Sequence, residues 1–499
     1  MKKNQIISFI LCLLLLAQVI GFPAAATETS DTGETEETTA STQSPVEETV
    51  ASVTAGTDSV STGCHSLDGQ VPLAGTAQIV ESAQAVFIYE VNTQTVLYAY
   101  NPDNHLYPGS LSKVLTALIA VEQGNLDDKV TFSTKWNSTL PLGARVADLK
   151  EGEELTLRDL VYCLLVESAN DAALGIADYF CASEEDFVVM MNQRAQELGC
   201  KDSHFVNCHG MDNEAQYTTA RDMARIVTAA CQNETFMEIF GAEKYVLQPN
   251  NKVEEERKLI SDNYLKEQTI LPMFNDDRVT GGKTSSTSGA GTSLVCTAED
   301  EEKTYVCVLM GATRVYNTNR TIKHYGNFEE MLELLAFAFD GYKVSNVLNE
   351  GQSLYQFPVT NGESNVVGGS GVQLHVLVPK DTKISTLIYK YAMKDGGISA
   401  PIQEGDQVGS MQIWYQTCCL SDVNLYALGS VRSAANSGLE IQGAASRDDS
   451  NVSSVLLFLG GVFAVVLVLL GIYLGYNWIR RSMVRSRRRR RRASRRRSR

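Results

Sequence analysis

Residues 110–120 read Ser-Leu-Ser-Lys-Val-Leu-Thr-Ala-Leu-Ile-Ala and open the most apolar helix that the sequence predicts between its two ends. The run after Lys113 is apolar on all sides, which is typical of a helix inside a protein core. Ser110 and Lys113 are three residues apart, so a helix places both side chains on one face. Burial disfavours the charged lysine, and a neutral amine beside a hydroxyl is a general base beside a nucleophile.

The spacing of Ser110 and Lys113 is weak by itself, because chance produces about one or two such pairs in a chain of this length. The alternative interpretation makes Ser110 a helix cap and Lys113 a solvated residue of the first helical turn. Other polar segments of the chain therefore have to decide between the two.

The segment Ser168-Ala169-Asn170 lies between two helices, which the sequence predicts over residues 156–166 and 170–180. A hydroxyl and an amide at such a junction can face a cleft, although either residue can instead cap the second helix. The segment Ser261-Asp262-Asn263 has the same form. We prefer the earlier segment because it joins two buried helices, whereas residues 261–263 lie among charged residues.

A third polar segment, residues 281–287, reads Gly-Gly-Lys-Thr-Ser-Ser-Thr and precedes a strand predicted over residues 292–296. Glycine at a strand edge lets a ligand lie against the backbone. A cation and a hydroxyl at the same edge hold an anion, so we expect Lys283 and Thr284 to bind a negatively charged group.

The two ends of the chain are expected to lie outside the folded units. Residues 1–26 have the charged, apolar and small-residue order of a secretory signal, and residues 27–63 are an acidic Thr/Ser/Glu tether without the apolar residues needed to fold. Residues 451–479 carry no charge and are long enough to span a bilayer, and the arginine-rich residues 480–499 are expected to stay in the cytoplasm. We expect a single-pass protein of the cell membrane with its body outside.

The charge distribution argues against nucleic acid as a partner. Without the 13 arginines from Arg480 onward and the two lysines of the signal, 28 basic residues remain against 59 acidic ones. A basic tail directly after a membrane span is a topology signal that contacts lipid headgroups. The cysteines include no C-x-x-C pair, and we expect Cys163 and Cys307 to be buried as small hydrophobic residues. Export permits disulfides, but the sequence does not determine their pairing.

Between the ends, the hydrophobic pattern changes near residue 340. Residues 64–342 alternate strands with helices, beginning with strands over residues 85–91 and 95–100 that flank a short turn, and predict an α+β unit. Residues 343–431 contain short strands separated by Gly, Asp and Pro and predict a small all-β domain. Residues 432–450 are expected to be a linker.

Together these segments resemble one known family. Residues 75–431 are similar to the low-molecular-mass penicillin-binding proteins of the D-alanyl-D-alanine carboxypeptidase type, serine peptidase family S11. Besides the three polar segments, the resemblance rests on residues 205–211, Phe-Val-Asn-Cys-His-Gly-Met, on residues 217–224, Tyr-Thr-Thr-Ala-Arg-Asp-Met-Ala, and on residues 400–406, Ala-Pro-Ile-Gln-Glu-Gly-Asp. It implies a penicillin-binding-protein/β-lactamase-like transpeptidase fold, followed by a small all-β domain and a C-terminal transmembrane helix.

The resemblance also implies an activity and a role for each site residue. The activity is removal of the terminal D-alanine from peptidoglycan stem peptides, inhibited by β-lactam antibiotics, without a cofactor or a metal. Ser110 would attack the carbonyl, Lys113 would take its proton, and Ser168 would relay a proton to the leaving amine. The substrate would be held by the remaining residues: Asn170, Lys283, Thr284, the backbone N–H of Ser286 and, aligned less securely, Arg320.

One position departs from the family's Lys-Thr-Gly pattern, because Ser285 takes the place of the glycine. A side chain there would crowd the D-alanine methyl group, or strain the backbone if the position requires a positive φ. Two alternative functions therefore stay open. One is a serine β-lactamase, although no E-x-x-L-N segment follows Ser168; the other is a catalytically degenerate, membrane-anchored peptidoglycan-binding protein.

Overall fold

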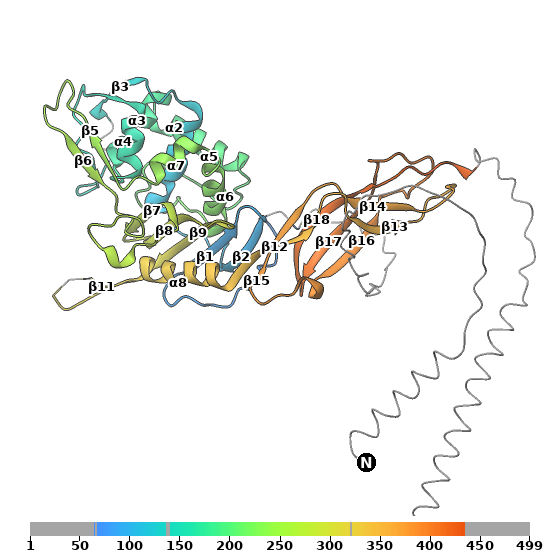
Figure 1. Ribbon diagram of the computed structural model, residues 1–499. Coiled ribbons are helices and arrows are strands. Elements are labelled where there is room, and N and C mark those ends of the chain that lie inside the picture. Colours follow the sequence, from blue (N-terminus) through green and yellow to red (C-terminus); the bar gives the residue numbers. More distant parts are fainter. Residues whose placement is uncertain (1–63, 65–66, 136–139, 320–321, 435–499) are drawn as a thin grey trace, which may run out of the picture. The chain divides into compact units, whose positions relative to one another are not determined.

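A computed structural model describes residue 64 and residues 67–135, 140–319 and 322–434 of the chain (Figure 1). The predicted signal peptide, the acidic tether, the predicted membrane span and the arginine-rich tail lie outside these residues. None of the helices in the described ranges is both long enough and apolar enough to cross a membrane.

The centre of the α+β unit is a five-stranded antiparallel sheet with the strand order β2-β1-β9-β8-β7. The first two strands form the hairpin that the sequence predicts around residues 92–94, and β1 then pairs with β9, more than 200 residues later. Strand β7, which carries the third polar segment, lies at the edge of the sheet. The strands are β1 (Ala85–Glu90), β2 (Thr95–Tyr100), β7 (Val279–Thr287), β8 (Gly291–Glu299) and β9 (Thr304–Ala312).

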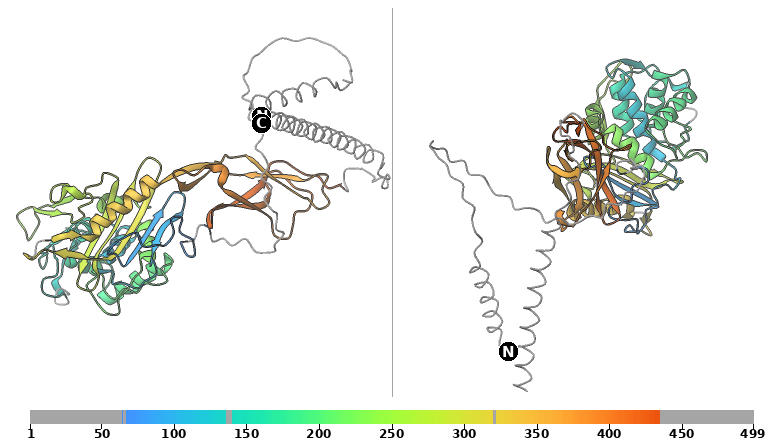
Figure 2. Two further views of the ribbon diagram at one scale, coloured as in Figure 1. Left: turned by 90° about the horizontal axis from the view of Figure 1, so that it is seen from below. Right: turned by 90° about the vertical axis from the view of Figure 1, so that its right-hand side faces the viewer.

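Both faces of this sheet are covered, and the alternation of side chains along β1 shows how. Phe87 belongs to a core shared with most of the helices, whereas Val86 and Ile88 belong to a second core formed with α8 (Gly326–Gly341). Figures 1 and 2 show α8 along one face of the sheet and the other helices on the opposite face. Successive residues of a strand point to opposite faces, so one buried strand serves both cores.

Helix α2 (Ser112–Gln123) is the centre of the larger core, and every residue from Ser112 to Ala120 is buried. This confirms the prediction from its apolar sequence. The helices predicted over residues 156–166 and 170–180 are also present, with ends within one residue of the expected ones. The helices around α2 are α3 (Leu157–Leu165), α4 (Asn170–Phe180), α5 (Glu184–Glu197), α6 (Ala220–Ala230) and α7 (Glu234–Phe240).

Three small antiparallel hairpins complete the α+β unit. They are formed by β3 (Lys129–Thr131) with β4 (Glu154–Thr156), by β5 (Lys244–Leu247) with β6 (Arg257–Ile260), and by β10 (Arg314–Tyr316) with β11 (Ile322–Tyr325).

Residues 342–434 are all-β, as the sequence predicts. A five-stranded sheet with the order β13-β14-β18-β17-β16 and a two-stranded β12-β15 sheet enclose their own apolar core. The strands are β12 (Tyr342–Leu348), β13 (Ser353–Phe357), β14 (Val366–Ser370), β15 (Leu374–Pro379), β16 (Ile388–Met393), β17 (Gln407–Tyr415) and β18 (Cys418–Ala427). No α-helix occurs over residues 342–434.

A disulfide joins Cys64, at the start of the described chain, to Cys419 in β18. The pairing closes a loop that contains the whole α+β unit. Cys163 and Cys307 are free and buried, which confirms the expectation that they pack as small hydrophobic residues.

Candidate active site

Ser110 lies in a short 3₁₀ turn, Gly109–Leu111, that leads directly into α2. The sequence predicts that the helix itself opens at Ser110, and this detail is wrong by two residues. The backbone N–H of Ser112 bonds back to the carbonyls of Gly109 and Ser110, which tightens the turn before the α-helix begins. The tighter turn still brings Ser110 and Lys113 together.

The Lys113 amine is fully buried and has three polar neighbours. Its Nζ lies 3.1 Å from Ser110 Oγ and 2.8 Å from Asn170 Oδ1, and it also bonds the His209 carbonyl. Burial lowers the pKa of Lys113 well below its usual value, and the nearby charge of Lys283 lowers it further. A neutral amine has two hydrogens and one lone pair. Two partners can only accept, so the lone pair is left for the Ser110 hydroxyl.

Ser168 and Asn170 lie where α3 gives way to α4. The Asn170 side chain holds the Lys113 amine, and its backbone N–H donates to the Arg145 carbonyl over 2.8 Å. Ser168 is buried and has a φ of +61°, an uncommon conformation for a residue with a side chain. Its hydroxyl makes no hydrogen bond within the described ranges of the chain. A strained serine with an unused hydroxyl is typical of a functional position.

Lys283 is fully buried in β7, and its nearest carboxylate is Asp262, 3.8 Å away. The same carboxylate accepts a 2.6 Å hydrogen bond from the Thr284 hydroxyl. It also forms an ion pair with Arg145, in which the nitrogen and oxygen atoms are 2.8 Å apart. Burial lowers the pKa of Lys283, although Asp262 partly offsets this. Burial alone would raise the pKa of Asp262, but Lys283 and Arg145 outweigh it and the pKa falls. Lys283 and Thr284 therefore already contact a negative charge, which belongs to a side chain of the protein.

The preference for residues 168–170 agrees with the contact between Asn170 and Lys113. Asp262, from the other S-x-N segment, nevertheless lies at the same site, because it contacts Lys283 and Thr284. Its charged surroundings are the active site itself. Asn263 packs against Gly282 in β7, where a side chain at residue 282 would lie 2.5 Å from the Asn263 amide nitrogen. The S-x-N pattern alone does not distinguish residues 168–170 from residues 261–263, and the structure shows that both support the site.

Arg145 is a second residue that the sequence analysis missed. Its guanidinium pairs with Glu167 and Asp262, which come from the α3–α4 junction and from the chain before β7. Burial alone would lower the pKa of Arg145, and the two carboxylates raise it instead. No motif marks this arginine, because its partners lie 22 and 117 residues away.

Ser285 stands where the family's Lys-Thr-Gly pattern has glycine, and its backbone is not strained. It lies in the middle of β7 opposite Ser293 and is not among the residues with positive φ. Its hydroxyl oxygen accepts a 2.9 Å hydrogen bond from the backbone N–H of Ser110. The expectation of a strained backbone is therefore wrong, since the strand continues regularly through this residue. Ser286, next in the strand, is exposed at the sheet edge, and Arg320 lies outside the described residues.

Residues 209–211 pack against the turn that carries Ser110. A side chain at Gly210 would lie 1.9 Å from the carbonyl oxygen of Gly109, so only glycine fits there, and its φ is +81°. The His209 ring is buried, which lowers its pKa to about 3, with a further contribution from Lys113. The imidazole is therefore neutral.

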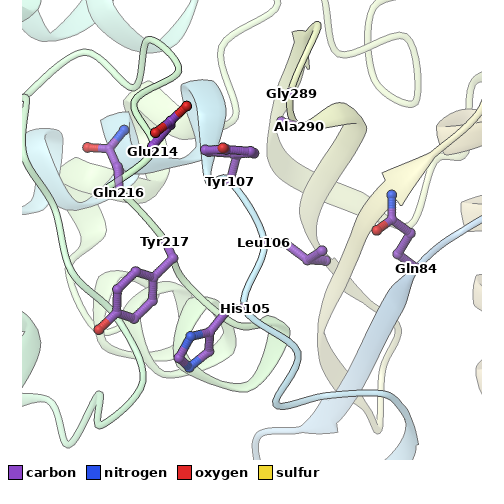
Figure 3. A pocket seen from close by; sticks show the side chains of 9 residues that line it. All are labelled: Gln84, His105, Leu106, Tyr107, Glu214, Gln216, Tyr217, Gly289 and Ala290. Atoms are coloured by element: carbon purple, nitrogen blue, oxygen red, sulfur yellow. The ribbon is translucent and has the colours of Figure 1, made fainter.

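A surface pocket of about 410 Å³ lies against the segment that leads to Ser110, with Tyr107 in its lining (Figure 3). It shares no residue with the Ser110, Lys113, Asn170 and Lys283 constellation. Its walls come from residues 105–107, from residues 214–217 and from the β7–β8 turn, together with Gln84. The lining residues are Gln84, His105, Leu106, Tyr107, Glu214, Gln216, Tyr217, Gly289 and Ala290.

Two family profiles match the chain. The D-alanyl-D-alanine carboxypeptidase profile matches residues 74–314, and the profile of the penicillin-binding protein 5 C-terminal domain matches residues 342–433. The D-alanyl-D-alanine carboxypeptidase DacF of Bacillus subtilis is 28% identical over 342 residues, which are 67% of this chain and 82% of the relative. DacD of Escherichia coli is 28% identical over 336 residues, which are 66% of this chain and 81% of the relative.

Solved structures show the same fold. Penicillin-binding protein 5 from Haemophilus influenzae superposes with a TM-score of 0.58 at 26% identity and covers 72% of this chain and 100% of its own. The D-alanyl-D-alanine carboxypeptidase DacD from Francisella tularensis gives a TM-score of 0.57 at 22% identity over 72% of this chain and 96% of its own, a similarity of fold. The three motifs, the two profiles and these similarities show that the chain belongs to the low-molecular-mass penicillin-binding proteins of serine peptidase family S11.

Proposed function

We propose that this chain is a serine-type D-alanyl-D-alanine carboxypeptidase that removes the terminal D-alanine from peptidoglycan stem peptides through an acyl-enzyme. The observation that carries the proposal is the arrangement of Lys113. Asn170 and the His209 carbonyl take its two hydrogens, and the lone pair faces Ser110 Oγ at 3.1 Å. A base within hydrogen-bond reach of a hydroxyl is the geometry that nucleophilic catalysis requires.

Acylation follows from this arrangement. Lys113 takes the proton of Ser110 as the oxygen attacks the carbonyl carbon of the penultimate D-alanine. The carbon–nitrogen bond then breaks, and the proton held by Lys113 passes through the Ser168 hydroxyl to the leaving amine, which returns Lys113 to its neutral form. Water attacks the resulting ester, with Lys113 again as base, and releases the shortened stem peptide.

The edge strand β7 binds the substrate in this proposal. The exposed Ser286 presents its backbone to the substrate, and its N–H and that of Ser110 receive the oxyanion. Lys283 and Thr284 bind the terminal carboxylate, with Arg320 as a further contact, while Asn170 holds the peptide backbone. Because Asp262 contacts both Lys283 and Thr284, the incoming carboxylate has to share or replace that contact.

Inhibition by β-lactams tests the proposal directly. The full chain in membranes and its Ser110→Ala variant are incubated with a fluorescent penicillin, and the label is followed over time alongside D-alanine release from a D-Ala-D-Ala peptide. Lasting label and D-alanine release, both absent from the variant, are the expected results. Rapid loss of label without D-alanine release would indicate a β-lactamase, and an unlabelled protein would indicate a peptidoglycan-binding protein without catalysis.

We further propose that the enzyme is exported and held by residues 451–479, with the arginine-rich tail in the cytoplasm. The amino-acid pattern of the two ends supports this topology. The all-β domain then fixes the active site at a set height above the membrane. Protease added to intact cells that carry tags at both ends is expected to spare the C-terminal tag, and digestion of that tag would contradict the topology.

A further inference from the structure

The Ser285 side chain packs against Gly109, and this contact depends on the absence of a side chain at residue 109. A side chain at Gly109 would place its first carbon 2.1 Å from Ser285 Oγ, so the Ser285 side chain would have to rotate away. The serine hydroxymethyl group therefore occupies the space that a side chain at residue 109 would need. From there its oxygen accepts the 2.9 Å hydrogen bond of the Ser110 N–H.

The backbone on the nucleophile side of this contact is held firmly. The Ser112 hydroxyl donates to the Gly109 carbonyl over 3.0 Å, and Gly210 packs so close to the same carbonyl that no side chain fits between them. Gly109 has a φ of +51°, which glycine adopts without the steric cost that other residues incur. Any adjustment in this contact therefore comes from Ser285, whose side chain can rotate about one bond.

We propose that the Ser285 hydroxyl is an internal ligand of the Ser110 N–H, and that a substrate must displace it before acylation. The inference rests on the proposed function, in which this N–H is one of two donors to the carbonyl oxygen of the substrate. In the resting enzyme the donor is already satisfied. Acylation then exchanges one hydrogen bond for another, and Ser285 with its complement Gly109 sets part of the barrier.

Ser285 is expected to affect acylation and deacylation differently. Before acylation, the hydroxyl competes with the substrate carbonyl for one donor. In the acyl-enzyme the ester carbonyl has already taken that donor, so the hydroxyl no longer opposes the next step. Ser285 is therefore expected to slow acylation while it leaves deacylation nearly unchanged, whereas a general distortion of the site would slow both.

The first test uses Ser285→Ala, which removes the hydroxyl and keeps the Cβ atom. In the full chain, the rate constant of acylation by a fluorescent penicillin is expected to rise about 3- to 10-fold, the equivalent of one net hydrogen bond. Deacylation is expected to change less than about twofold on the same scale. Ser288→Ala, which removes an exposed hydroxyl from the same hairpin, is the matched control and is expected to change neither rate. Slower acylation in Ser285→Ala would overturn the proposal, because it would show that the hydroxyl stabilises the oxyanion.

The second test is a double-mutant cycle with Gly109→Ala and Ser285→Gly. Gly109→Ala alone is expected to slow acylation, because its first carbon would lie 2.1 Å from Ser285 Oγ and force that side chain to move. Ser285→Gly in the same chain is expected to recover part of the rate. The strain of alanine at positive φ is present with either residue at 285, so the cycle isolates the contact. Additive effects would overturn the pairing. Thermal unfolding of each variant separates misfolding from an altered site.

If the unmodified chain itself is not acylated at Ser110, the proposed function fails, whereas normal acylation with an unaffected Ser285→Ala rate refutes only this inference.

Discussion

The Asp262 carboxylate lies 3.8 Å from the Lys283 amine and accepts a hydrogen bond from Thr284. These are the two residues to which the family resemblance assigns the terminal carboxylate of the substrate. The protein thus places a negative charge of its own beside the expected position of a negative substrate. This contact stabilises the buried cation in the resting enzyme and opposes the approach of a second carboxylate.

Replacing Asp262 with Asn is expected to lower KM for a peptide that ends in a free D-alanine carboxylate severalfold at neutral pH. The like-charge repulsion disappears, while an amide can still accept from Thr284. Steady-state release of D-alanine measures the effect. The control substrate is the same peptide with a terminal amide, for which KM is expected to stay the same. A higher KM for the carboxylate substrate would show that Asp262 positions Lys283 instead of competing with the substrate.

The rate of acylation is expected to have two pH limbs, because it needs a neutral Lys113 and a charged Lys283. Burial lowers the pKa of Lys113 well below its usual value, so the rate falls when the pH drops through that lowered value. Burial also lowers the pKa of Lys283, so the rate falls again when the pH rises through it. Fluorescent penicillin labelling across the pH range measures both limbs.

Asp262→Asn provides the control for this profile. The loss of the carboxylate removes the contact that favours the charged Lys283, so the alkaline limb is expected to move to lower pH. An alkaline limb that stays in place in Asp262→Asn would rule out Lys283 as its origin.

Lys113→Ala is expected to lower the acylation rate by about 10²- to 10⁴-fold, as loss of a general base does.

His209 is expected to make the protein less stable in mild acid. Its pKa falls from 6.5 to about 3 in the folded protein, so between these values the unfolded chain binds a proton that the native protein does not. The free energy of unfolding therefore rises with pH through this window, by about 1.4 kcal/mol per pH unit from this residue. His209→Gln keeps the backbone carbonyl that bonds Lys113 and removes the titrating ring. Urea unfolding at several pH values is expected to give a shallower slope for the variant, and equal slopes would contradict the assignment.

The Cys64–Cys419 disulfide is expected to stabilise the protein without a direct effect on the Ser110 site. The closed loop spans 355 residues, for which chain entropy predicts a contribution on the order of 5 kcal/mol. Cys64→Ser/Cys419→Ser is expected to unfold at lower temperature and to keep its rate of penicillin acylation. The neighbouring Cys418 is free, so Cys418→Ser is the matched control and is expected to keep the mobility of the oxidised chain on a non-reducing gel. A mobility change in Cys418→Ser would mean that the other cysteine forms the bond.

Part of the site can be predicted from the sequence because its residues are close together along the chain. Ser110 and Lys113 are one turn apart, and the apolar run after them predicts a buried helix whatever surrounds it. The strand and helix periods likewise predict the hairpin at residues 92–94 and the helices α3 and α4. The two ends of the chain remain predictions from composition.

By itself, the sequence determined the α+β and all-β order, the Ser110–Lys113 pair and the family, because each depends on neighbours a few residues apart or on motifs that can be matched along the chain. Only the tertiary structure placed the Ser285 hydroxyl on the Ser110 N–H, 175 residues away, and joined Cys64 to Cys419. It also turned the charged residues around Asp262 into part of the site. Such contacts depend on which face of a strand a side chain takes and on how separate elements pack, and a shift of one residue in register reverses the first and changes the second.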